Sequence, residues 1–117
     1  MSDATAQVNG GGRFRKTFLT AIEMCEGAPR VGVVATTPTR ADHIRQVCLH
    51  AMTQKGEVTI YVDDEASEKL AKNDHDVIVL DSSLPLRMRQ GLTRIAKTRR
   101  RACTVIHIKK WSTEPPA

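Results

Sequence analysis

Aromatic residues are the scarcest component of this chain. Phe occurs twice and Trp and Tyr once each, so aromatic residues make up 3% of the 117 residues. Proteins that bind single-stranded nucleic acid without sequence preference stack successive bases on aromatic side chains. The chain has too few aromatic side chains for that mode. Any nucleic-acid binding is therefore expected to be electrostatic and strongly dependent on salt.

Long hydrophobic runs are also absent. No apolar stretch approaches the roughly 20 residues that a helix needs to cross a bilayer. Residues 1–12 lack the charged and then apolar order of a secretory signal peptide. We therefore expect a cytoplasmic protein with no membrane partner.

Cysteine and histidine occur in no pattern that suggests chemistry. Cys25, Cys48 and Cys103 are odd in number, far apart and embedded in apolar patterns, so we expect reduced core residues. No two histidines share a helix at ligand spacing, and none stands beside Cys or Ser in a nucleophile motif. His107 alternates with apolar residues and is expected to face a helix or a partner. The sequence thus predicts no metal site, no cofactor, no catalytic residue and no enzyme activity.

The composition is that of one globular domain with a basic surface. Hydrophobic residues account for 40% and charged residues for 26%, and the formal net charge is +5. Residues 1–12 are polar and rich in glycine, and residues 112–117 end in Glu-Pro-Pro-Ala. We interpret these segments as flexible tails on a single domain of residues 13–111.

Between the tails, helical apolar spacing alternates with short apolar runs, which is typical of helices joined to buried strands. Helices are predicted at residues 13–26, 40–55, 65–73 and 86–101. Strands are predicted at residues 30–35, 58–62, 76–80 and 103–108. Strands joined through helices are parallel, with right-handed crossovers. The sequence therefore predicts an α/β fold: an open parallel sheet of about four strands, order 2-1-3-4, with an extra N-terminal helix.

Two strand ends carry motifs that match a known family. Val33-Val34 is followed by a short polar loop and Pro38, and residues 76–81 form an apolar strand that ends at Asp81, before Leu84-Pro85. The strand types, their order and the spacing from Thr36 to Asp81 resemble a response-regulator receiver domain. The resemblance implies a flavodoxin-like fold in which Asp81 stands at the phosphoacceptor position.

The departures from that family argue against phosphotransfer. Receivers hold Mg²⁺ with an acidic pair after the first strand, because a hard cation needs several oxygen ligands. Here Ala35 and Thr36 stand at those positions, Lys109 replaces the switch Ser or Thr, and the strand that carries the family's lysine is missing. The resemblance thus implies a degenerate, truncated pseudo-receiver. Asp81 is expected to cap the next helix or to accept hydrogen bonds from the amides of Ser82 and Ser83.

A weaker resemblance lies near the N-terminus. Residues 10–17, Gly-Gly-Gly-Arg-Phe-Arg-Lys-Thr, resemble a phosphate-binding P-loop with Arg15 in place of its last glycine. Such a loop must follow a buried strand, and residues 1–9 offer only Ala6-Gln7-Val8. This alternative implies a degenerate P-loop nucleotide-binding protein in which Lys16 and Thr17 contact the nucleotide.

The predicted helix over residues 87–101 is rich in arginine and lysine and has no acid. Helical geometry places four of its cations opposite the apolar stripe: Arg87, Arg94, Lys97 and Arg101. Such a face binds an acidic protein surface or the phosphate backbone of a nucleic acid. A basic nucleic-acid-binding accessory protein is therefore the second alternative function.

The missing last strand predicts an interaction edge. Without it, the strand at residues 103–108 would present unpaired backbone groups beside Val105, Ile106 and Trp111, an arrangement that invites pairing. A second copy or a strand from a partner would cover that edge. We therefore expect a non-catalytic protein-interaction module with a regulatory or assembly role, acting on a protein partner or by self-association.

Overall fold

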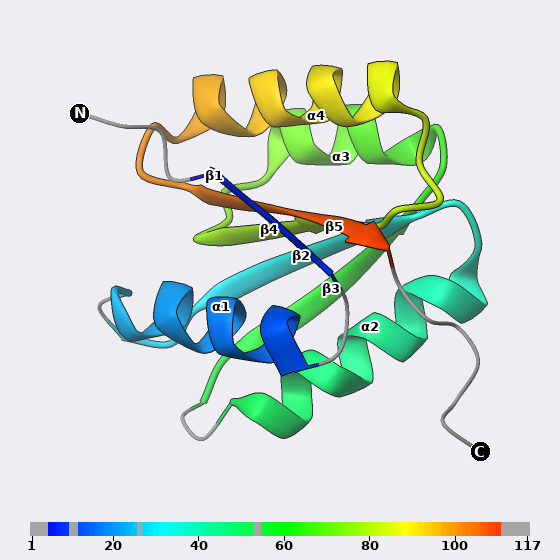
Figure 1. The fold of residues 1–117 in the computed structure, drawn as a ribbon. Coiled ribbons are helices and arrows are strands. Elements are labelled where there is room, and N and C mark those ends of the chain that lie inside the picture. Colours follow the sequence, from blue (N-terminus) through cyan, green and yellow to red (C-terminus); the bar gives the residue numbers. More distant parts are fainter. Residues whose placement is uncertain (1–4, 10–11, 26, 53–54, 111–117) are drawn as a thin grey trace.

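The structure of the chain is a computed structural model that describes residues 5–9, 12–25, 27–52 and 55–110 (Figure 1). Strands and helices alternate along the whole chain. The strands are β1 (Thr5–Asn9), β2 (Arg30–Ala35), β3 (Glu57–Val62), β4 (Val77–Leu80) and β5 (Thr104–Lys110). The helices are α1 (Gly12–Glu23), α2 (Pro38–Ala51), α3 (Glu65–Lys72) and α4 (Leu86–Arg99).

All strands belong to one parallel sheet with the order β1-β5-β4-β2-β3. The strands predicted from the apolar runs correspond to β2, β3, β4 and β5. Their spatial order, β3-β2-β4-β5, is the predicted order 2-1-3-4, so the α/β class and this topology are confirmed. The predicted N-terminal helix is α1.

The strand β1 corrects two expectations. It pairs in parallel with β5, with Thr5 opposite Val105 and Gln7 opposite His107. The expected open edge at β5 is therefore wrong, and so is the placement of all of residues 1–12 outside the fold. A five-residue strand that alternates polar and apolar residues gives no continuous apolar run, so the sequence did not reveal it. Trp111, the third residue of the expected edge, lies outside the described residues.

Two helices cover each face of the sheet, with α1 and α2 on one side and α3 and α4 on the other (Figure 1). Successive residues of the central strands point into opposite layers. In β2, for example, Val33 packs with Phe18 and Ile44, whereas Val34 packs in the cluster of Leu80 and Leu92. The strands are therefore buried on both faces, which explains their continuous apolar runs.

The position of the carboxyl ends of the strands decides where a site can form. The connection after β2 leads outward to β3, whereas β4 lies on the other side of β2, so the strand order reverses between β2 and β4. In open α/β sheets, ligands bind outside the carboxyl ends of the strands at such a switch point. The loops at residues 36–37 and 81–85 meet there.

Two glycines give a matched test of this packing. A Cβ on Gly32 in β2 would lie 2.9 Å from Cδ1 of Ile78 and 3.1 Å from ring carbons of His75 and Tyr61, whereas a Cβ on Gly91 in α4 would meet nothing within 4 Å. Gly32→Ala should lower the free energy of unfolding by about 1–3 kcal/mol through overpacking. Gly91→Ala should raise it by about 0.5–1 kcal/mol through helix propensity. Urea unfolding of both variants measures the two changes, and equal changes would contradict the packing around β2.

Candidate functional site

The centre of the switch point is the side chain of Asp81, which follows β4 and has no solvent-exposed surface. Arg40, in the first turn of α2, binds this carboxylate with two nitrogens. Its Nε lies 2.6 Å from Oδ2 of Asp81, and its Nη2 lies 3.1 Å from Oδ1. This paired geometry fits the planar guanidinium group to both carboxylate oxygens.

Local sequence explains why Arg40 reaches the carboxylate. Thr37 caps the N-terminus of α2, because its Oγ1 accepts a hydrogen bond from the backbone N–H of Arg40 at 3.3 Å. Pro38 follows at the start of the helix, where a missing N–H costs nothing. The helix therefore begins directly after β2, and its first turn stands beside the end of β4.

Two hydroxyl groups complete the network around the carboxylate. The backbone N–H of Ser83 donates to Oδ2 of Asp81 at 3.2 Å, and the Ser83 hydroxyl donates to the same oxygen. Since the only hydroxyl hydrogen of Ser83 is used there, Thr36 Oγ1 donates to Ser83 Oγ at 3.0 Å. The loop after β2 is thereby tied to the loop after β4. Of the two roles that the sequence analysis expected for Asp81, the structure shows the second: its carboxylate accepts a hydrogen bond from the amide of Ser83. It does not cap α4, whose N-cap residue is Pro85.

The electrostatics of the pair favour the ionised state of both groups. Burial raises the pKa of the Asp81 carboxyl, but the hydrogen bonds from Arg40 and Ser83 and the positive charge of Arg40 outweigh burial and hold the pKa below its ordinary value. The hydrogen bond to Asp81 raises the pKa of Arg40. The site is therefore an internal ion pair.

The residues at these strand ends are engaged within the fold. Ala35 is buried and apolar, Thr36 is engaged with Ser83, and both oxygens of Asp81 accept hydrogen bonds. Among the described residues, no three His, Cys, Asp or Glu side chains form a group that could hold a metal ion. Ala35, Thr36 and Asp81 thus lie at neighbouring strand ends, where the guanidinium group of Arg40 supplies the positive charge beside the carboxylate.

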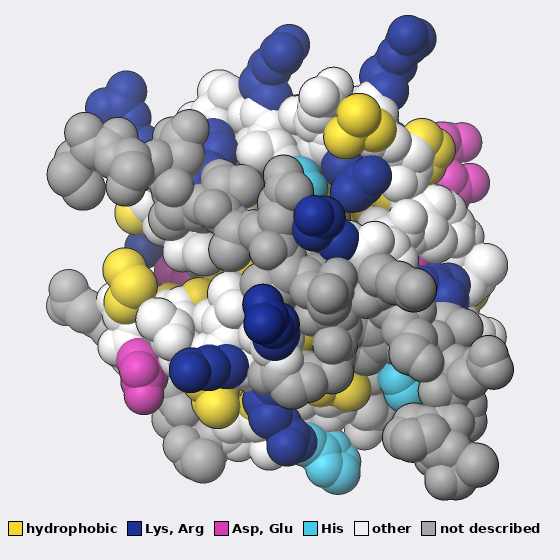
Figure 2. Space-filling view, viewed as in Figure 1, with side chains coloured by type: hydrophobic (Ala, Val, Ile, Leu, Met, Phe, Trp, Pro, Cys, Tyr) yellow, Lys and Arg dark blue, Asp and Glu magenta, His cyan; other side chains and the backbone are white. Residues whose placement is uncertain are grey.

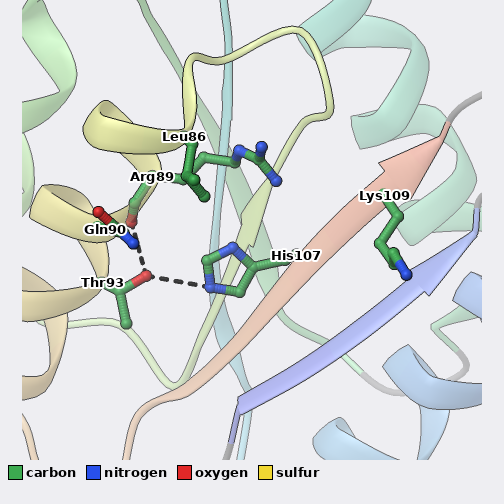
Figure 3. Close-up of a pocket in the computed structure, with 6 residues that line it drawn as sticks. All are labelled: Leu86, Arg89, Gln90, Thr93, His107 and Lys109. Carbon is green, nitrogen blue, oxygen red and sulfur yellow. Dashed lines mark hydrogen bonds between the residues drawn. The ribbon is translucent and has the colours of Figure 1, made fainter.

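Lys109, the fourth residue of the expected degenerate site, lies elsewhere. It lines a hollow of about 460 Å³ between α4 and β5, together with Leu86, Arg89, Gln90, Thr93 and His107 (Figure 3). The sequence analysis predicted only that His107 faces a helix or a partner. Its polar side chain within an apolar strand was the one available signal for this hollow.

The basic face of α4 is smaller than the sequence predicted. Arg87, Arg94 and Arg101 are exposed. Lys97 is only half-exposed, because its Nζ donates to the backbone carbonyl of Cys103 at 2.8 Å. The expectation that Lys97 points outward is therefore wrong, since its long side chain folds back over the end of the helix.

Other cations near the end of α4 are used within the fold. Arg99 binds Asp74 at 2.7 Å, and Arg100 binds Asp76 at 3.2 Å. These pairs neutralise the positive charges of Arg99 and Arg100 at the C-terminal end of α4. Arg87, Arg94 and Arg101 form no ion pair with any described acid, so they carry the net positive charge of this surface, which we name the α4 basic face.

The predicted binding edge at β5 does not exist in the folded chain. Val105 and Ile106 have no exposed surface, and β5 is paired with β1 on one side and with β4 on the other. A partner strand would have to displace one of these neighbours. The strands at the two ends of the sheet are instead β1 and β3.

The P-loop-like segment is largely helical. A strand does precede it, contrary to the sequence analysis, but only two residues separate β1 from α1. Lys16 and Thr17 lie in the second turn of α1, and backbone N–H groups beyond the first turn bond within a helix. A phosphate-binding loop needs such groups free to curl around phosphate. The segment therefore lacks the form of a P-loop at these residues.

Comparison of the chain with protein-family models, with curated proteins and with solved structures found no match. Within the part of the chain that the structure describes, no helix has the length and apolar character to cross a membrane. The receiver and P-loop resemblances remain predictions from short motifs.

The Arg40–Asp81 pair predicts a specific pH dependence of stability. Arg40→Met leaves a buried carboxylate without its partner and should lower the free energy of unfolding at pH 7 by about 3 kcal/mol. In the parent chain, the lowered pKa of Asp81 stabilises the fold above the unfolded pKa of about 3.9, and this contribution is lost as the pH falls through the folded value. The difference between parent and variant should therefore shrink in acid, as urea unfolding at several pH values will show.

Arg45→Met is the matched control for that measurement. Arg45 pairs with Asp42 on the surface of α2, where both side chains are partly exposed. Such pairs contribute about 0.3–0.5 kcal/mol. If the Arg40 and Arg45 variants lose the same stability at every pH, the buried pair does not anchor the switch point.

Proposed function

We propose that this protein is a non-catalytic, receiver-like interaction module with a regulatory or assembly role. The observation that carries the proposal is the closed ion pair at the switch point. Where open α/β sheets bind their ligand, this chain holds Asp81 with Arg40 and Ser83. A site filled by its own side chains supports a structural use of the fold, with function on the outer surface.

The α4 basic face is the surface that we assign to the partner. Arg87 and Arg94 lie seven residues apart on the helix, about 10.5 Å along its axis, and Arg101 follows just beyond its end. Figure 2 shows Lys and Arg side chains that project from the layer in which Figure 1 draws α4. Exposed cations without internal partners attract an acidic surface and speed its association.

A second copy of the chain is one candidate for the acidic surface. The turn before α3 and its first residues expose several acids, which are Asp63, Asp64, Glu65 and Glu68. They are separated from the α4 basic face in the sequence and offer the complementary charge. Self-association and binding to another acidic protein therefore use the same cations.

A nucleic acid is the alternative ligand for this face, because phosphate backbones attract the same cations. That alternative requires affinity for duplex DNA or RNA that falls steeply with salt. Binding of an acidic protein depends on shape as well as charge and falls less steeply. Parallel titrations at two salt concentrations distinguish the two.

The first prediction from this proposal concerns chemistry at Asp81. Incubation with acetyl phosphate and Mg²⁺ should leave the chain unmodified, because Ala35 and Thr36 supply no metal ligand charge and Arg40 occupies the carboxylate. Intact mass spectrometry in acid-free buffer measures any adduct, and Asp81→Asn serves as the blank. A stoichiometric acid-labile phosphate that is present on the parent and absent from the blank would sink the proposal.

A further prediction concerns association kinetics. The double variant Arg87→Glu and Arg94→Glu should slow association with a protein partner captured from the native source by roughly tenfold at low salt, because charges at an interface rim govern the on-rate. Surface plasmon resonance measures the rate, and sedimentation velocity measures self-association of the same samples.

Arg13→Glu and Arg15→Glu together form the control for the charge reversal. Both residues are exposed on α1, which covers the opposite face of the sheet, and the net charge changes equally. The control should bind at the parent rate. If both double variants slow association alike, net charge alone acts and the α4 basic face has no special role.

A further inference from the structure

The hollow between α4 and β5 lies at the carboxyl end of the sheet, one strand away from the Asp81 ion pair. It measures about 460 Å³, which is within the usual range of small-molecule sites. The first turns of α4 form one wall and the end of β5 forms the other (Figure 3). Among the residues that the structure describes, its lining contains two cations and no acid, and Leu86, which is 60% exposed, adds an apolar rim.

His107 forms the floor of this hollow and is 9% exposed. The hydroxyl of Thr93 donates to the backbone carbonyl of Arg89 at 2.7 Å, which uses its single hydrogen. The contact of 3.2 Å between Thr93 Oγ1 and His107 Nε2 must then be a hydrogen bond donated by the imidazole (Figure 3). In the neutral ring, Nδ1 is therefore the unprotonated nitrogen, and no described residue donates to it.

Arg89 and Lys109 bring positive charge to the same hollow from opposite walls. The Nε of Arg89 donates to the backbone carbonyl of Leu84 at 3.1 Å, which fixes the guanidinium group. Figure 3 shows this group on the same side of α4 as the His107 ring. Lys109 follows His107 by two residues on β5, lines the same hollow and is exposed.

Burial and the surrounding charges set the pKa of the His107 imidazole. Burial, and then the nearby charge of Arg89, lower the pKa of His107 from its ordinary value. The charged groups that line the hollow with His107 are Arg89 from α4 and Lys109 from β5, and the neighbouring strand β4 consists of apolar residues. A negative group in the hollow would reverse the effect of Arg89 and favour the protonated ring.

We propose that this hollow is a binding site for a small organic anion, held through its carboxylate or phosphate oxygens. The terminal nitrogens of Arg89 and the ammonium group of Lys109 bind the oxygens, because charge-assisted hydrogen bonds from two sides fit an oxyanion. The amide of Gln90 adds a neutral donor at the rim. The apolar part of the ligand rests against Leu86. This site is separate from the α4 basic face and does not depend on the proposed protein partner.

The test is an NMR titration of the whole chain with inorganic phosphate, acetate, phenyl phosphate and benzoate. The His107 ring and the Gln90 side-chain amide should shift in a saturable way, and the pKa of His107 should rise on binding. The phosphate and carboxylate probes show which oxyanion the site prefers, and either preference agrees with the proposal. The aromatic probes should bind more tightly than their inorganic or acetate counterparts if Leu86 supports the organic part.

Matched variants decide whether the shifts come from the hollow. Lys109→Gln and Arg89→Gln should each weaken binding about tenfold or more, which is the effect of losing one charge-assisted hydrogen bond. Arg87→Gln removes the same charge from the same helix. Because Arg87 does not line the hollow, this variant should change the affinity for the anion less than twofold. Since Lys109 is exposed, its variant should fold like the parent even if Arg89→Gln disturbs the start of α4.

Two results would overturn the site. One is the absence of saturable shifts at His107 and Gln90 with all four probes at millimolar concentration. The other is equal weakening by Lys109→Gln and Arg87→Gln, which would mean that anions sense only the net charge. Neither result would affect the proposed protein partner, because that proposal is tested by association kinetics of Arg87 and Arg94 variants.

Discussion

The ion pair between Arg40 and Asp81 is the interaction on which the carboxyl-terminal edge of the sheet depends. A carboxylate without exposed surface is stable only when charge and hydrogen bonds compensate for its lost hydration. Arg40 supplies both from α2, and Ser83 donates hydrogen bonds to the same carboxylate from the loop after β4. Thr36, in the loop after β2, donates in turn to the hydroxyl of Ser83. One buried negative charge thereby fixes where a helix begins and how two loops lie.

This constraint separates the buried ion pair from the surfaces that we propose to bind ligands. Because the hydrogen bonds of Asp81 are made within the fold, its charge is not offered to a ligand, and the cations that we assign to ligands lie on and beside α4. The exposed cations Arg87, Arg94 and Arg101 face outward, whereas Arg89 and Lys109 line the hollow above His107. One helix thus presents two different surfaces, one open and one concave.

The sequence predicted those parts of the fold that are coded by local apolar patterns. The continuous apolar runs of β2 and β4 identified central strands, because both faces of such strands are buried. Thr36 and Asp81 could be placed at neighbouring strand ends for the same reason. Arg40 could not be predicted as the partner of Asp81, since a long flexible side chain from the first turn of α2 reaches a loop that is distant in the sequence. Lys97 was misplaced because helical periodicity does not show that a lysine can bend back to a carbonyl such as that of Cys103.

The strand β1 has a consequence for how the chain completes its fold. In a flavodoxin-like order 2-1-3-4-5, the outermost strand follows the others along the chain, but here the first strand fills that place. Thr5 therefore pairs with Val105, its neighbour in the sheet, only after β2, β3, β4 and the helices between them have been synthesised. Contacts between residues so distant in sequence form slowly, because a large loop must close first. The pairing of β1 with β5 is thus the sheet contact between the two strands that lie farthest apart in the sequence.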